Sequence, residues 1–102
     1  MNDDRLTEKL AALVLGWKAT PDRFIKAGHS WIPRWRFRPL AELADAFLVL
    51  DHAADHYILT KNCSTFAAEV QIDSGWGKAV GAHKARTITL AVARALRLEM
   101  DV

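Results

Sequence analysis

The feature that most constrains the fold is a period-two pattern in the second half of the chain. Apolar side chains stand at every second position, at Phe66, Ala68, Val70 and Ile72. Because successive side chains of a β-strand point to opposite faces, this pattern predicts a strand with one buried face. Turn residues bound it, in segments 62–64 and 73–75. Segments 57–61 and 76–82 are therefore predicted as partner strands in an antiparallel meander.

Three further segments have the period of an amphipathic helix. The first covers residues 3–15, with an apolar face at Leu6, Leu10, Leu13 and, after Gly16, Trp17. The second runs from Pro39 to about His52, with a predicted buried face of Leu40, Leu43, Ala44, Phe47 and Leu50 or Asp51. The third runs from Lys84 to Leu98, with Ile88, Ala91, Val92, Ala95 and Leu98 as its apolar face.

A short strand is predicted at residues 23–27, after the turn signal Thr20-Pro21-Asp22. The order of elements predicts an α+β domain, in which three helices pack on a small antiparallel sheet of about three or four short strands. The glycines of the last strand, Gly77 and Gly81, indicate a bulge or a sheet edge.

Composition narrows the class of protein. The chain has 102 residues, of which 51% are hydrophobic and 25% charged, so we expect one globular domain spanning residues 1–102. A single cysteine, Cys63, allows no internal disulfide and suits a reducing cytoplasm. The start, Met1-Asn2-Asp3-Asp4, is acidic where a signal peptide is basic, and the longest apolar run, 10–15, is too short to span a bilayer. We expect a cytoplasmic protein with no membrane partner.

The segment Ser30–Pro39 contains three aromatic residues and three arginines. If it is extended, Trp31, Pro33, Trp35 and Phe37 share one face, and Ile32, Arg34, Arg36 and Arg38 share the other. We therefore expect the aromatic side to pack on the domain and the arginines to form an exposed row. Such a row can bind phosphate or carboxylate. The predicted ligand-binding residues are Arg34, Arg36, Arg38, Trp31 and Trp35.

Two other patterns allow a chemical interpretation and a structural one. His52 and His56 are four residues apart, which on a continuous helix would suit a metal, but they fall where the second helix is predicted to end. Cys63 lies in a predicted turn, and no neighbouring residue type there would activate its thiol. We expect neither a metal site nor a cofactor.

Three pieces of the sequence resemble a known family. Leu15-Gly16-Trp17-Lys18 is similar to the "MGW" signature of the phage ABA sandwich domain family. Phe37-Arg38-Pro39 with the segment 43–47 resembles its "FSP…IADAW" motif, and the segment 84–91 resembles its final "PLAICLAAL" helix. The chain differs in having Arg38 where a small hydroxyl residue is usual and Arg86 where a proline is common. The resemblance implies a phage or prophage origin, hence a bacterial host cell, and an α-β-α sandwich. It implies no enzymatic activity.

Three functional hypotheses follow. The first is a phage or prophage accessory protein that binds a host or phage protein, a small anionic ligand such as a nucleotide, or a second copy of itself as a homodimer, without catalysis. The second is a nucleotide or nucleic-acid binding protein that uses the arginine row. The third is an enzyme with a metal at His52 and His56. No set of nucleophile, base and orienting group supports the third.

Overall fold

A computed structural model describes residues 3–26 and 28–98, so residues 1–2, 27 and 99–102 lie outside the described residues. The elements follow one another as α1 (Asp3–Leu15), β1 (Lys18–Ala19), β2 (Arg23–Ile25), β3 (Trp31–Pro33), the 3-10 helix η1 (Arg34–Arg36), α2 (Leu43–Ala53), β4 (His56–Asn62), β5 (Thr65–Ile72), β6 (Gly75–Gly81) and α3 (Lys84–Ala95). Over these described ranges the fold has three α-helices and two antiparallel sheets of three strands each. The predicted α+β class is confirmed.

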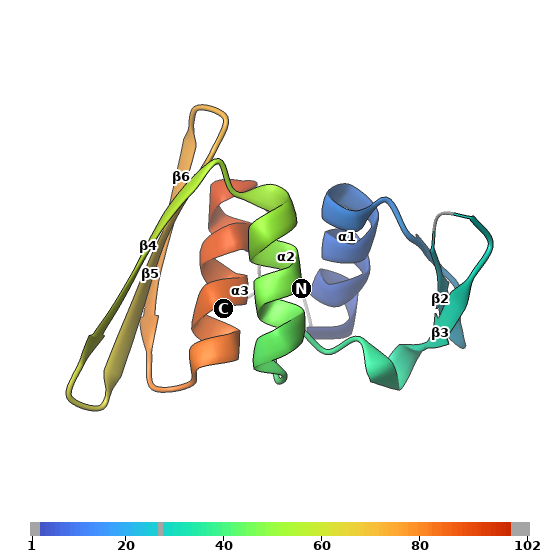
Figure 1. Ribbon diagram of the computed structural model, residues 1–102, viewed down its shortest axis with the longest axis horizontal. Coiled ribbons are helices and arrows are strands. Elements are labelled where there is room, and N and C mark those ends of the chain that lie inside the picture. The colour runs from blue at the N-terminus through green and yellow to red at the C-terminus, as the bar shows by residue number, and fades with distance from the viewer. Residues whose placement is uncertain (1–2, 27, 99–102) are drawn as a thin grey trace.

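The two sheets stand at opposite ends of the molecule, and the helices lie between them (Figure 1). α3 packs on β5 and β6, α2 packs on α3, and α1 packs on α2 and on β1 of the smaller sheet. The layer order is therefore sheet, helices, sheet, which differs from the helix, sheet, helix order implied by the family resemblance. The helices pack on the face of the larger sheet that carries Ala68, Val70 and Ala79, while the outward face mixes charged residues such as Glu69 and Lys78 with exposed apolar side chains.

The larger sheet is the meander that the period-two pattern predicts, in the order β4-β5-β6. Ala68 and Val70 are buried, and Phe66 and Ile72 are half-buried against the core, so the predicted inner face is confirmed. Both hairpin turns contain a residue with left-handed backbone, Cys63 at φ 56° and Asp73 at φ 53°. This geometry matches the twist of the paired strands and keeps the connections short.

The glycines of β6 reflect the close approach of a helix. A Cβ atom at Gly77 would lie 2.1 Å from the carbonyl oxygen of Ala91 and 2.3 Å from the amide nitrogen of Ala95. The backbone of α3 therefore rests directly on the strand, which only a residue without a side chain permits. β6 is also an edge strand, as its glycines indicated.

The helix boundaries agree with the sequence in part. α1 has the predicted bounds, and Gly16 follows it with a left-handed φ of 70°. Its buried face is rotated from the predicted one, because Ala11 is buried while Leu13 is 63% exposed. α3 ends at Ala95 rather than Leu98, since Arg97 adopts a left-handed φ of 59°.

The prediction for the second helix was wrong at its start. α2 begins at Leu43, not at Pro39, because the amides of Ala41 and Glu42 both donate to the carbonyl of Arg38 and close a separate turn. Its buried residues are Ala46, Val49 and Leu50, whereas Leu43 and Ala44 are exposed. The carbonyl of Pro39 instead accepts a hydrogen bond at 2.6 Å from the buried hydroxyl of Thr89 on α3.

Candidate binding groove

Three aromatic side chains form a cluster beneath the segment 31–38, and this cluster supports the groove described below. The ring of Phe37 lies 5.0 Å from that of Trp17 and 5.6 Å from that of Phe24, centroid to centroid, and both pairs meet edge to face. Phe24 and Phe37 are buried. Aromatic pairs in this geometry add stability beyond the area they bury. Trp17 therefore closes the core after α1, as the sequence predicted.

The alternation across residues 31–38 stops at the 3-10 helix η1. In the smaller sheet Ile32 pairs with Phe24 and takes the inner face, so Trp31 is on the outer face and 52% exposed. The tighter turn of η1 then leaves Trp35 72% exposed, while Phe37 is buried. The prediction that Trp31 and Trp35 pack on the domain was therefore wrong, and for Phe37 it is confirmed.

The three arginines also fail to form an exposed row. Arg34 is half-buried: its Nη1 donates to the carbonyl of Thr20 at 2.7 Å, its Nη2 pairs with the Glu8 carboxylate, and its guanidinium lies 5.1 Å from the ring centroid of Phe24. Arg36 and Arg38 are exposed. Because η1 turns the backbone, the arginines no longer share one face of an extended chain.

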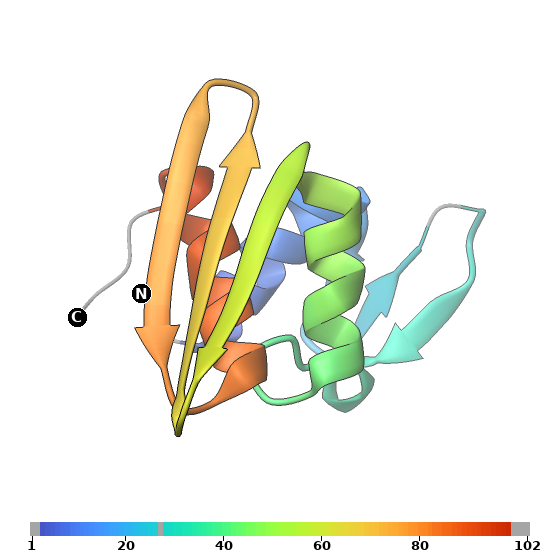
Figure 2. The same cartoon turned by 60° about the vertical axis from the view of Figure 1, so that its left-hand side comes forward.

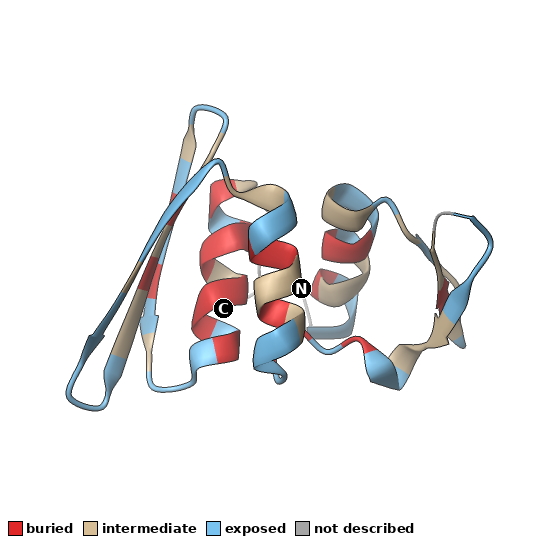
Figure 3. Cartoon of the chain, viewed as in Figure 1, coloured by how far each residue is buried: buried red, intermediate tan, exposed pale blue. Residues whose placement is uncertain are grey.

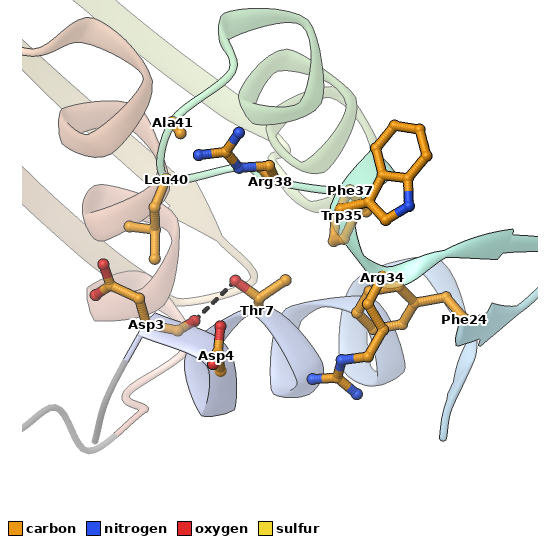
Figure 4. Close-up of a pocket in the computed structure, with 10 residues that line it drawn as sticks. All are labelled: Asp3, Asp4, Thr7, Phe24, Arg34, Trp35, Phe37, Arg38, Leu40 and Ala41. Carbon is orange, nitrogen blue, oxygen red and sulfur yellow. Dashed lines mark hydrogen bonds between the residues drawn. The ribbon is translucent and has the colours of Figure 1, made fainter. Parts of the chain in front are cut away.

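A groove of about 490 Å³ opens between the start of α1 and the segment 34–41 (Figure 4). This volume is within the range typical of ligand sites. Asp3, Asp4 and Thr7 of α1 line one side, and Figure 4 shows the segment that carries Trp35, Arg38 and Leu40 along the other. The remaining lining residues are Phe24, Arg34, Phe37 and Ala41.

Of the five predicted site residues, the groove brings three together, Arg34, Trp35 and Arg38. Arg36 lies beside it, with its guanidinium 6.0 Å from the ring centroid of Trp35. Trp31 lies apart from the lining residues, on the outer face of the smaller sheet.

The groove carries charges of both signs. Asp3 is paired with Arg86 at 3.0 Å, and Arg34 is paired with Glu8. Within residues 3–26 and 28–98, Asp4 and the guanidinium of Arg38 have no hydrogen-bond or ion-pair partner. One carboxylate and one guanidinium thus remain free to meet a ligand. This balance favours a partner that itself has both charges over a uniform polyanion.

Trp31 is held by its own small arrangement of charges. The guanidinium of Arg23 lies 4.2 Å from its ring centroid and donates to Asp22 Oδ2 at 2.9 Å. The hydrogen bond from Arg23, helped by one from Thr20, lowers the pKa of Asp22, and the same contact raises the pKa of Arg23. Arg23 is therefore fixed over the indole face as a cation.

The other chemically suggestive residues lie apart. α2 ends at Ala53, between His52 and His56, so the helical spacing of the two histidines is lost, as the sequence predicted. Among the residues that the structure describes, no group of three metal-ligating side chains occurs. Cys63 is exposed in its turn. His83 caps α3, where its Nδ1 accepts from the amide of Arg86 at 3.2 Å.

Sequence reasoning missed the contribution of α1 to the groove. Asp3 and Asp4 lie in the first turn of α1, where negative charge is stabilising without any ligand, so the local sequence does not mark them as groove residues. Their proximity to Arg38 depends on how α1 packs on α2, which no local pattern encodes.

No helix in the described ranges has the length and apolar character needed to cross a membrane.

Comparison with known proteins gives a match of fold. No family model matches the sequence, and no curated protein matches it. Among solved structures, the chain is similar to a phage protein from Bacillus cereus ATCC 14579, whose crystal structure was determined at 2.0 Å. The two are 15% identical, the match covers 99% of this chain and 93% of the other, and the TM-score is 0.76. This chain therefore shares its fold with a phage protein.

Proposed function

We propose that this chain is a small accessory protein of a phage or prophage, related to the phage ABA sandwich domain family although its layers are ordered differently, that works by binding another protein and catalyses no reaction. The fold shared with a Bacillus cereus phage protein supports the origin. The residues that resemble the family, around Gly16, Pro39 and Lys84, support the more specific assignment. Localisation in the cytoplasm of the bacterial host belongs to the same proposal.

The observation that carries the binding role is the exposure of Trp35 at the groove. Trp35 presents 72% of its surface to solvent beside the groove, and the segment that carries it is fixed on both sides. Arg34 anchors it to α1 through Glu8, and Phe37 anchors it to the aromatic cluster. Tryptophan and arginine dominate the energetics of protein interfaces. A rigidly presented Trp35 beside Arg36 and Arg38 is suited to such contacts.

The charges of the groove favour a polypeptide as the partner. Asp4 and Arg38 are both available, so a peptide segment with a basic and an acidic residue complements the site. A chain of phosphates would meet the carboxylates of Asp3 and Asp4. The absence of catalysis is supported by the placement of the nucleophiles, since Cys63, Ser64 and Ser74 are exposed in hairpin turns.

The proposal is tested by photo-crosslinking in bacteria that carry the phage. A photoreactive residue replaces exposed Arg36, and crosslinked proteins are identified by mass spectrometry. We expect one protein to be captured, its yield to fall at least tenfold when Trp35→Ala is added, and no capture from the same photoreactive residue at Lys84. Equal yields with and without Trp35→Ala would refute the role of this surface.

A second candidate is binding of a nucleotide or single-stranded nucleic acid. It is favoured by the position of Arg36 beside the exposed face of Trp35, since stacking aromatics with adjacent cations are the usual elements of such sites. Titration of the intrinsic fluorescence with a short oligothymidine separates the two candidates. Quenching that weakens steeply with salt and disappears in Trp35→Ala supports nucleic acid. No quenching at about millimolar oligonucleotide would leave the protein partner as the assignment.

A further inference from the structure

Strand β4 is an exposed edge strand that no helix among the described residues covers. It pairs with β5 along one side only, and it is an edge of the sheet β4-β5-β6. α3 covers β5 and β6, while six of the seven residues of β4 are exposed (Figures 2 and 3). Tyr57 is 40% exposed and Ile58, on the opposite face, 47%. The strand is thus largely exposed on both faces and along its edge, with only Leu59 packed against the core.

The two edges of this sheet differ in how they are protected. β6 has Lys78 at its centre, and the Arg94 side chain donates to the Lys78 carbonyl at 2.6 Å. A central lysine and a covered backbone are two ways in which proteins block edge pairing. In β4 the central residues, Ile58 to Thr60, carry no charge, and the one lysine of the strand, Lys61, is next to its last residue. No side chain among the described residues bonds to the β4 backbone.

We infer that β4 is an interface for a second copy of this chain. The two β4 strands pair antiparallel about a two-fold axis at Leu59, which joins two sheets of three strands into one sheet of six. This register places Ile58 opposite Thr60 and Tyr57 opposite Lys61. An antiparallel edge pairing of this kind uses backbone groups that are otherwise left to solvent.

Charge complementarity selects this register. Tyr57 and Lys61 are on the inner face of the sheet, because their partners on β5 are Val70 and Phe66. The Tyr57 hydroxyl donates to the carboxylate of Asp51 at 3.5 Å. Lys61 of the second copy, opposite Tyr57, therefore points toward Asp51. Lys61 has no ion-pair partner within the described part of its own chain, and the two-fold axis creates this pair twice.

The size of the interface sets its strength. Seven paired residues extend over about 23 Å, which gives a contact smaller than the roughly 800 Å² per partner of a stable complex. We therefore expect a dimer in exchange with the monomer, with a dissociation constant between about 10 μM and 1 mM. Sedimentation equilibrium over that range measures it.

The decisive variant introduces like charges across the proposed axis. Ile58→Lys with Thr60→Lys places two lysines opposite two lysines of the other copy, on the outer face where neither side chain supports the core. Val80→Lys is the matched control, because Val80 is on the same outer face, is 59% exposed, and belongs to the protected edge. We expect dimerisation at least tenfold weaker in the first variant and unchanged within about twofold in the control.

A charge exchange provides the independent measurement. Lys61→Glu should weaken the dimer, and adding Asp51→Lys should restore it, because the exchanged pair attracts again. Amide hydrogen exchange of residues 56–62 should slow as protein concentration rises. The proposal is overturned if the protein remains monomeric at about 1 mM, if Val80→Lys disrupts the dimer while the double lysine variant does not, or if Asp51→Lys fails to rescue Lys61→Glu.

Discussion

At the scale of single residues, two tryptophans of this chain have opposite roles. Trp17 packs against Phe37 and Phe24 at 5.0 and 6.2 Å, whereas Trp35 is 72% exposed. We expect Trp17→Ala to lower the free energy of unfolding by about 3 kcal/mol or more. Trp35→Ala should lower it by less than about 0.5 kcal/mol, as for other surface changes. Urea denaturation of both variants checks this, and a large loss for Trp35→Ala would mean that its indole packs in the fold.

Also at the residue scale, the Asp22 carboxylate predicts a pH dependence. Its pKa is lowered in the folded state by the hydrogen bond from Arg23, so its contribution to stability is fully present above the ordinary aspartate pKa of about 3.9. That contribution is lost as the pH falls through the lower folded-state value. The difference in melting temperature between the protein and Asp22→Asn should therefore shrink as the pH falls from about 5 to below 3. A constant difference would show that the carboxylate charge is not involved.

At the scale of elements, the contact of α3 with β6 depends on the absence of a side chain at Gly77. We expect Gly77→Ala to destabilise the fold by about 3 kcal/mol or more, because the new methyl group would meet the backbone of Ala91 and Ala95. Gly16→Ala is the control, since no atom lies within 4 Å of a Cβ there and only its φ of 70° opposes alanine. Its expected cost is about 1–2 kcal/mol. Thermal melts that rank Gly16→Ala as the more damaging change would contradict the close approach.

At the scale of the whole molecule, one buried hydrogen bond connects the segment 34–41, which lines the groove, to α3, the helix that packs on the larger sheet. The hydroxyl of Thr89 donates to the Pro39 carbonyl across 50 residues of sequence, and both residues are buried. Thr89→Val keeps the shape but leaves that carbonyl unpaired, so we expect a loss of about 1–3 kcal/mol in unfolding free energy. Thr87→Val should cost less, because the carbonyl of His83 keeps its bond from the Thr87 amide. Equal losses in chemical denaturation would refute the special role of Thr89.

The sequence alone determined those elements whose repeat of apolar side chains and whose flanking turn residues lie within one continuous segment. The alternation at Phe66–Ile72 and the turn residues on either side of it specify the meander, because side-chain period and turn geometry are local properties. The bounds of α1 and the left-handed Gly16 follow from the same kind of signal. The end of α2 between His52 and His56 was also predictable, since it depends on nearby residues.

Only the tertiary structure decided which face of a segment is buried and which distant residues meet. The sequence of residues 31–38 allows either face to pack on the domain. In the structure Ile32 pairs with buried Phe24 on the inner face of the smaller sheet, and Trp31 is therefore exposed to solvent. The groove likewise needs Asp4 and Arg38, which the packing of α1 on α2 brings together. Local periodicity indicates that the two faces of a segment differ in polarity. Which face is buried depends on the surface that packs against it, and residues distant in sequence that form this surface cannot be recognised from the segment itself.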